Sequence, residues 1–154
     1  TAADLKAFYE SRPGDVRATL VDFVNNDLSI EPDGRTQKYR GEVFQDNSAF
    51  IIRYSEMLLI KSEAGGLAAG LDKLNYLRSV RGMPIVMPVT DEEFLDALIA
   101  ERRSELNFEG HRYFDLAHFG MVSTVLGESV LPCFPIPNRE INASGGLIVQ
   151  YPGY

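Results

Sequence analysis

The stretch that most constrains this chain is residues 101–116, ERRSELNFEGHRYFDL, the densest run of opposite charges in the sequence. Ser104 falls on one face of a helix over residues 95–109, and the opposite, apolar face carries Leu95, Leu98, Ile99, Arg102, Leu106 and Glu109, bordered by Glu105. An uncompensated charge is costly to bury, so charges in such a stripe are paired. We therefore predict a structural ion-pair network that consists of Arg102, Glu105, Glu109, Arg112 and Asp115.

The same carboxylates raise the question of catalysis. Glu101, Glu105 and Glu109 recur every four residues, and paired carboxylates perform acid–base chemistry in glycosidases. Arginines are interleaved among them, and a nearby guanidinium favours the ionised carboxylate, whereas a general acid needs the opposite shift. We therefore expect no catalytic residues and no enzymatic activity.

A metal site is the second chemical possibility. His111, Asp115 and His118 stand at i, i+4 and i+7, a spacing that can ligate zinc from one face of a helix. His111 and His118 are the 2 histidines of the chain. We expect structural or surface roles for them, with no metal and no other cofactor.

Charge and hydropathy narrow the function classes further. The net charge of −7 and pI of about 4.8 speak against nucleic acid, which requires a basic footprint. No apolar run approaches the roughly 20 residues of a membrane span. Residues 1–15 have neither the basic start nor the apolar core of a signal peptide. The length of 154 residues suits one domain over 1–154.

The pattern of apolar residues and breakers predicts an all-α chain. Gly65-Gly66 separates two helices, which should form an antiparallel hairpin. Thr90 should cap the next helix, with Glu93 completing a capping box. The tail from Val122 onward is rich in Pro and Gly and predicts mostly coil. The predicted helices cover residues 2–11, 51–64, 66–81, 91–108 and 111–119.

Four blocks of this sequence resemble a known family. ERRSELNFEGHRYFDLAHFG at 101–120 is similar to the "ER..EL.FEG.R..DL.R.G" signature of SusD/RagB-like proteins, nutrient-binding lipoproteins on the outer surface of Bacteroidetes cells. IRYSEMLLIKSEA at 52–64, FPIPNREI at 134–141 and QYPGY at 150–154 resemble three further family motifs, in family order. Tyr151 and His118 depart from the residues usual there.

The resemblance implies an all-α, SusD-like C-terminal region: a helical hairpin similar to one tetratricopeptide unit, further helices, and an irregular Pro/Gly-rich tail. It implies a piece without the family's signal peptide, lipid anchor and N-terminal helical repeats. The implied function is non-catalytic binding of an oligosaccharide on the extracellular face of the outer membrane, for delivery to a SusC-like TonB-dependent transporter. The implied partners are the oligosaccharide, that transporter and the rest of the SusD-like chain. A peptide ligand and a structural helical module with protein partners only remain as alternatives.

Ligand-contacting residues are the hardest to predict. Glycan sites use aromatic platforms, and the best exposed candidates are Tyr39 and Phe44, which share an irregular segment with Arg35 and Arg40. Packing in the core or anchoring a loop is the competing role for these rings, because aromatic side chains carry a large apolar area. The resemblance places most of the ligand surface in segments N-terminal to this chain, so we expect the chain alone to bind poorly.

Overall fold

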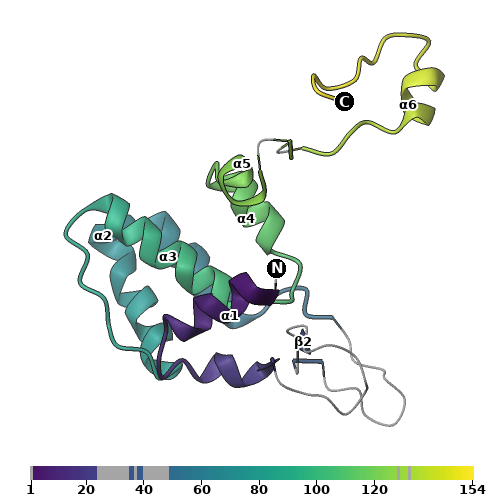
Figure 1. Cartoon of the computed structure of the whole chain (residues 1–154). Helices are drawn as coiled ribbons and strands as arrows, with labels where there is room; N and C mark the ends of the chain where they lie inside the picture. Colours follow the sequence, from purple (N-terminus) through teal and green to yellow (C-terminus); the bar gives the residue numbers. More distant parts are fainter. Residues whose placement is uncertain (1, 24–34, 37, 40–48, 128, 132) are drawn as a thin grey trace. The chain divides into compact units, whose positions relative to one another are not determined.

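The computed structural model describes residues 2–23, 35–36, 38–39, 49–127, 129–131 and 133–154 (Figure 1). They form two compact units, residues 1–111 and 112–154. The predicted all-α class is confirmed, because strands among the described residues are limited to one two-residue pair. Whether residues 1–154 act as one domain stays a prediction.

A helical hairpin forms the centre of the first unit. Helix α2 (Tyr54–Val80) loses helical geometry at Gly66, where φ is 58° and ψ is −163°, and folds back into two antiparallel arms (Figure 1). The arms approach so closely that a Cβ at Gly70 would lie 1.9 Å from the carbonyl oxygen of Ser62. Ser62 also donates a hydrogen bond of 2.9 Å to the Gly70 carbonyl. The predicted hairpin is confirmed, with Gly66 as its turn.

Helix α3 (Asp91–Glu105) packs against α2 and closes the apolar core. Thr90 Oγ1 accepts the Glu93 N–H at 3.1 Å, as predicted for the N-cap. The Glu93 carboxylate accepts the N–H of Val89, rather than that of Thr90. The buried apolar cluster consists of Leu59, Leu74, Leu77, Phe94, Leu98 and Leu106.

The predicted buried face of α3 was partly wrong. Leu95 is 38% exposed, whereas Ser104, placed on the opposite face, is fully buried. The reason is that α3 has a second neighbour, because Tyr9 donates a hydrogen bond of 3.4 Å to the Ser104 carbonyl. The helix also ends at Glu105, three residues earlier than predicted, and Phe108 adopts a φ of 63°.

The segment before α2 begins with α1 (Ala2–Glu10) and the 3₁₀ helix η1 (Val16–Leu20). Strand β1 (Val21–Asp22) then pairs antiparallel with β2 (Arg35–Thr36). Asp15 caps η1 by accepting the Arg17 N–H at 3.1 Å. The turn between α1 and η1 therefore carries charged residues into the interior of the first unit.

The described residues of the second unit form three short helices: α4 (Arg112–His118), α5 (Val122–Leu126) and α6 (Asn138–Ala143). Most of the described residues from Val122 onward are outside helices, as predicted, but α5 and α6 were not predicted. Side chains bonded to the backbone organise the tail: Tyr113 donates to the Leu131 carbonyl at 2.8 Å, and Tyr154 donates to the Cys133 carbonyl at 2.6 Å. Such bonds follow no sequence period.

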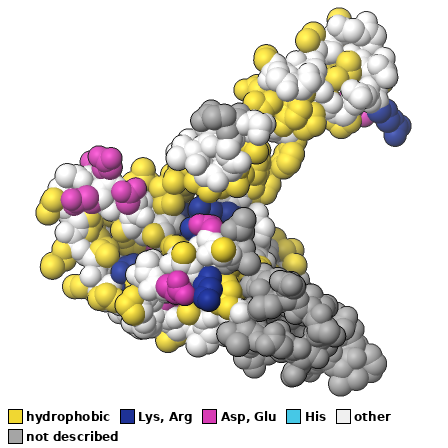
Figure 2. All heavy atoms as spheres, in the orientation of Figure 1, with side chains coloured by type: hydrophobic (Ala, Val, Ile, Leu, Met, Phe, Trp, Pro, Cys, Tyr) yellow, Lys and Arg dark blue, Asp and Glu magenta, His cyan; other side chains and the backbone are white. Residues whose placement is uncertain are grey.

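Among the described residues, no helix combines the length and apolar character needed to cross a membrane. Hydrophobic side chains nevertheless reach the surface of the helical part of the first unit, interspersed with acidic ones (Figure 2).

Candidate functional site

The dominant polar feature of the first unit is a buried set of ion pairs around the C-terminal half of α3, which we term the charged cluster. Its acidic members come from α3, from the residues after it, and from the turn before η1. Its basic members come from the N-terminal segment, from Lys38 and from both ends of α2. The cluster consists of Asp15, Glu101, Glu105 and Glu109 with Arg12, Arg17, Lys38, Arg53, Arg78 and Arg81.

Glu101 lies at one end of the cluster and is fully buried. Its Oε2 accepts hydrogen bonds from Arg12 Nη2 at 2.8 Å and from Arg78 Nη1 at 2.9 Å. Its Oε1 lies 2.7 Å from Arg17 Nη2 as an ion pair, without hydrogen-bond alignment. One α3 carboxylate thus joins the N-terminal segment to the second arm of α2.

Glu105, one helical turn later, is held by three arginines. It accepts hydrogen bonds from Arg17 at 2.9 Å, from Arg53 at 2.6 Å, and from Arg81 at 2.8 and 3.0 Å. Burial alone would raise the pKa of Glu105, but the hydrogen bonds from Arg81 and Arg53 outweigh it and hold this pKa well below the usual range. This carboxylate is therefore ionised and fixed.

Asp15 completes the carboxylates on the N-terminal side. It accepts hydrogen bonds from Arg12 Nε at 3.0 Å, from Arg17 Nε at 2.7 Å and from the Ser104 hydroxyl at 3.0 Å. Burial opposes ionisation, yet the hydrogen bonds and charge of Arg17, with a further bond from Arg12, lower the pKa of Asp15. The two residues that link Arg12 to Asp15 therefore set the spacing between these two members of the charged cluster.

Glu109 connects the cluster to the segment before α2. Its carboxylate accepts hydrogen bonds from Lys38 Nζ at 2.5 Å and from Arg53 Nε at 2.7 Å. Lys38 also donates to the Glu105 carbonyl at 2.7 Å. Burial lowers the pKa of Lys38, and Glu109 opposes that shift. Lys38 thereby holds the neighbouring Tyr39 close to the end of α3.

The structure places the predicted ion-pair residues as follows. Glu105 and Glu109 lie in the charged cluster, but they pair with residues distant in sequence: Arg17, Arg53, Arg81 and Lys38. Arg102 is buried; its pairing with Glu105, Glu109 or Asp115 stays a prediction. Arg112 and buried Asp115 belong to the second unit, and their membership of the network also stays a prediction.

Sequence reasoning left several members of the cluster out of the predicted network. Glu101 shares the four-residue spacing of Glu105 and Glu109, which was a usable signal of a common face. No comparable signal marked Arg12, Asp15 or Arg17, because residues 12–15 show only the chemistry of a helix-breaking turn.

The histidines have neighbours of their own. His111 Nδ1 lies 3.7 Å from Glu56 Oε1, and the exposed His118 contacts the ring of Phe119 edge-on. In the part of the chain that the structure describes, no group of three or more His, Cys, Asp or Glu side chains could hold a metal ion.

Of the predicted ligand-contacting residues, Tyr39 is the one whose side chain the structure describes. It is half-buried, and its ring centroid lies 5.5 Å from that of Phe50, which is exposed. Phe44 and Arg40 lie outside the described residues, and only the backbone of Arg35 is described. The two rings, next to the anchored Lys38, form the best available candidate for a ligand platform.

Comparison with known proteins identifies the family. The sequence model of the SusD family matches residues 30–130. SusD-like protein P38 of Formosa agariphila is 31% identical over 114 residues, covering 63% of this chain and 23% of that protein. SusD-like protein P2 of the same organism is 28% identical over 127 residues, covering 67% of this chain and 25% of that protein.

A solved structure supports the same assignment. A laminarin binding SusD-like protein superposes with a TM-score of 0.58 and 34% sequence identity, over 69% of this chain and 23% of that chain. The chain thus spans about a quarter of the length of the relatives it matches. The family match covers more than half of the chain, and we conclude that the chain belongs to the SusD family.

Proposed function

We propose that this chain is part of a non-catalytic glycan-binding protein, and that its ligand is a β-glucan of the laminarin class. The observation that carries the proposal is the 34% identity to a laminarin binding SusD-like protein over 69% of this chain. That similarity favours an oligosaccharide over a peptide. Family membership supports two further parts of the proposal: exposure on the extracellular face of the outer membrane, and delivery of the glycan to a SusC-like TonB-dependent transporter.

The charged cluster supports the absence of catalysis. A glycosidase needs one carboxyl group that is protonated near neutral pH. The hydrogen bonds of Glu105 and Asp15 to arginines lower the pKa of each instead. The cluster is better suited to fixing the N-terminal segment, Lys38 and α2 around one helix.

The ring pair of Tyr39 and Phe50 is the part of this chain that we assign to the glycan surface. Sugar C–H faces stack on aromatic rings, and Lys38, bound to Glu109 at 2.5 Å, restrains the backbone next to Tyr39. A restrained platform loses less conformational entropy on binding than a free loop does. The family resemblance still places most of the ligand surface outside this chain.

Calorimetry with laminarin tests the proposal, using the full-length protein and this chain in parallel. We expect the full-length protein to bind laminarin without releasing shorter sugars, and this chain to bind it weakly or not at all. Tyr39→Ala should weaken binding by the full-length protein about tenfold, which corresponds to a stacking contribution of about 1.4 kcal/mol. Phe114→Ala, which removes an exposed ring that belongs neither to this platform nor to the groove described below, is the matched control.

Two results would contradict the proposal. Hydrolysis of laminarin that Glu105→Gln abolishes in a folded variant would make the protein an enzyme. Equal affinity of this chain and the full-length protein would show that the site lies wholly within these 154 residues.

A further inference from the structure

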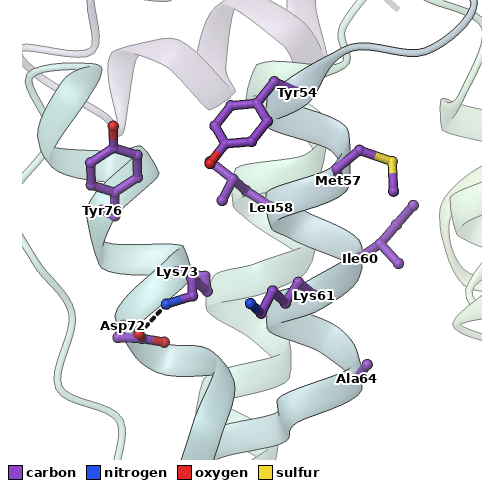
Figure 3. Close-up of a pocket in the computed structure, with 9 residues that line it drawn as sticks. All are labelled: Tyr54, Met57, Leu58, Ile60, Lys61, Ala64, Asp72, Lys73 and Tyr76. Carbon is purple, nitrogen blue, oxygen red and sulfur yellow. Dashed lines mark hydrogen bonds and ion pairs between the residues drawn. The ribbon is translucent and has the colours of Figure 1, made fainter.

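A groove between the two arms of α2 lies on a part of the first unit that the glycan platform does not use. Its volume is about 720 Å³. Its walls come from both arms, which run antiparallel on either side of it (Figure 3). The side chains that shape it include Tyr54, Met57, Ile60 and Lys61 from the first arm and Lys73 and Tyr76 from the second.

The groove is apolar and open. Tyr54, Met57, Ile60 and Tyr76 are among the exposed large hydrophobic side chains of the chain, and the first three recur at intervals of three residues along one arm. Ile51 and Ile52, just before α2, are exposed as well. Contiguous apolar surface of this kind usually marks an interaction site in a soluble protein.

A helix suits this groove better than a sugar does. An apolar groove between two neighbouring helices is a common binding site for an amphipathic helix, which inserts its side chains at i, i+3, i+4 and i+7. Tyr54 and Tyr76 offer rings on which a sugar could stack, but most of the remaining lining is aliphatic. Met57, Leu58 and Ile60 offer no hydrogen bond to sugar hydroxyl groups, and an unpaired buried hydroxyl is unfavourable. A helical hairpin also leaves one face uncovered unless another element stacks on it.

Charge specifies the partner further. The groove carries Lys61 and Lys73 against a single acidic residue, Asp72, which already pairs with Lys73 (Figure 3). The lining is therefore net positive in a chain whose net charge is −7. We propose that the groove between the arms of α2 docks an amphipathic α-helix that carries leucine-like side chains on one face and carboxylates along its edges.

Fluorescence anisotropy with a designed peptide tests this docking. The probe is a labelled amphipathic helix of about 18 residues, or five turns, with leucines on one face and glutamates along both edges. Its twin carries lysines in place of the glutamates. We expect this chain to bind the acidic peptide at least roughly tenfold more tightly than the twin, and increasing salt to reduce that preference.

Three variants define the site. Met57→Asp should weaken binding of the acidic peptide by roughly tenfold or more, because it places a negative charge on the apolar lining contributed by the first arm. Met87→Asp is the matched control: Met87 is 81% exposed and is not part of the groove lining. Lys61→Glu combined with Lys73→Glu should reverse the preference toward the lysine twin, which tests the charge argument even if Met57→Asp does not fold.

Every other outcome overturns the proposal. Failure of both peptides to bind, equal binding of the two, or insensitivity to Met57→Asp and to the lysine reversals would exclude a helix site. Displacement of the peptide by laminarin would assign the groove to sugar. A wild-type dimer in sedimentation velocity that Met57→Asp dissociates, and Met87→Asp does not, would identify a second copy of this chain as the occupant.

Discussion

The two halves of α3 are buried in different ways, although both pack in the first unit. The N-terminal half contributes Phe94 and Leu98 to an apolar cluster with leucines of α2. The C-terminal half contributes Glu101 and Glu105, which are equally buried but lie among arginines. Apolar burial is non-directional, whereas each carboxylate requires donors at specific positions.

This difference shows what each half does for the fold. The apolar half packs mainly against the neighbouring α2, with Val86 of the connecting segment beside it. The charged half joins three separate segments: the N-terminal turn, the residues around Lys38, and both ends of α2. Buried ion pairs add little net stability over apolar packing, but loss of one partner leaves an uncompensated charge. The charged half therefore makes this arrangement of segments specific.

The largest expected effect comes from removing the central carboxylate of the charged half. Glu101→Ala leaves Arg12, Arg17 and Arg78 without this negative charge and should reduce the free energy of unfolding by about 3–5 kcal/mol. Urea unfolding measures the change. Glu92→Ala, at an exposed position of the same helix, is the matched control. A loss below about 1 kcal/mol would show that water or another group replaces Glu101.

The apolar half should respond almost as strongly but without electrostatics. Leu98→Ala should reduce the free energy of unfolding by about 3 kcal/mol, through lost burial and a residual cavity. Leu95→Ala, at a 38% exposed position, should reduce it by about 1 kcal/mol or less. If the two variants were equally destabilised, the orientation of α3 described above would be wrong.

These halves also differ in how far the sequence alone predicts them. The hairpin and α3 were predictable because Gly65-Gly66, Thr90 and a 3.6-residue period act locally. The partners of Glu101 were not, because Arg12 lies 89 residues away and ion-pair geometry depends on the tertiary fold. The tail helices were also missed, since side chain–backbone bonds such as that of Tyr113 leave no periodic signal. The environment of Tyr39 depends on the same long-range contacts, through Lys38 and Glu109.

Acid should affect the charged half selectively. The pKa values of Glu105 and Asp15 are lowered in the folded chain from their ordinary values of 4.5 and 3.8. As pH falls below about 4.5, the unfolded chain takes up protons first, so stability declines until the folded carboxylates also protonate. We expect a loss of about 1–3 kcal/mol between about pH 6 and pH 3.

Denaturant titrations across that pH range distinguish the halves. Glu105→Gln should flatten the decline, because it removes the most strongly shifted carboxylate, whereas Leu98→Ala should lower the curve without changing its slope. An unchanged slope in Glu105→Gln would assign the acid sensitivity to other carboxylates.

The smallest effect should come from an ion pair on the surface of the same helix. Arg103 on α3 contacts Asp4 of α1 at 2.6 Å, but the Asp4 side chain is 60% exposed. Water solvates both charges in the unfolded chain and most of Asp4 in the folded one, so Asp4→Ala should change the free energy of unfolding by only about 0–0.5 kcal/mol. Added salt should reduce even that difference.

Arg103→Ala should destabilise slightly more, by about 0.5–1 kcal/mol, because its guanidinium also lies 4.4 Å from the centre of the Phe8 ring. A loss above about 2 kcal/mol for Asp4→Ala would mean that the surface pair behaves like the buried ones, and that burial is not what separates the charged cluster from other ion pairs of this helix.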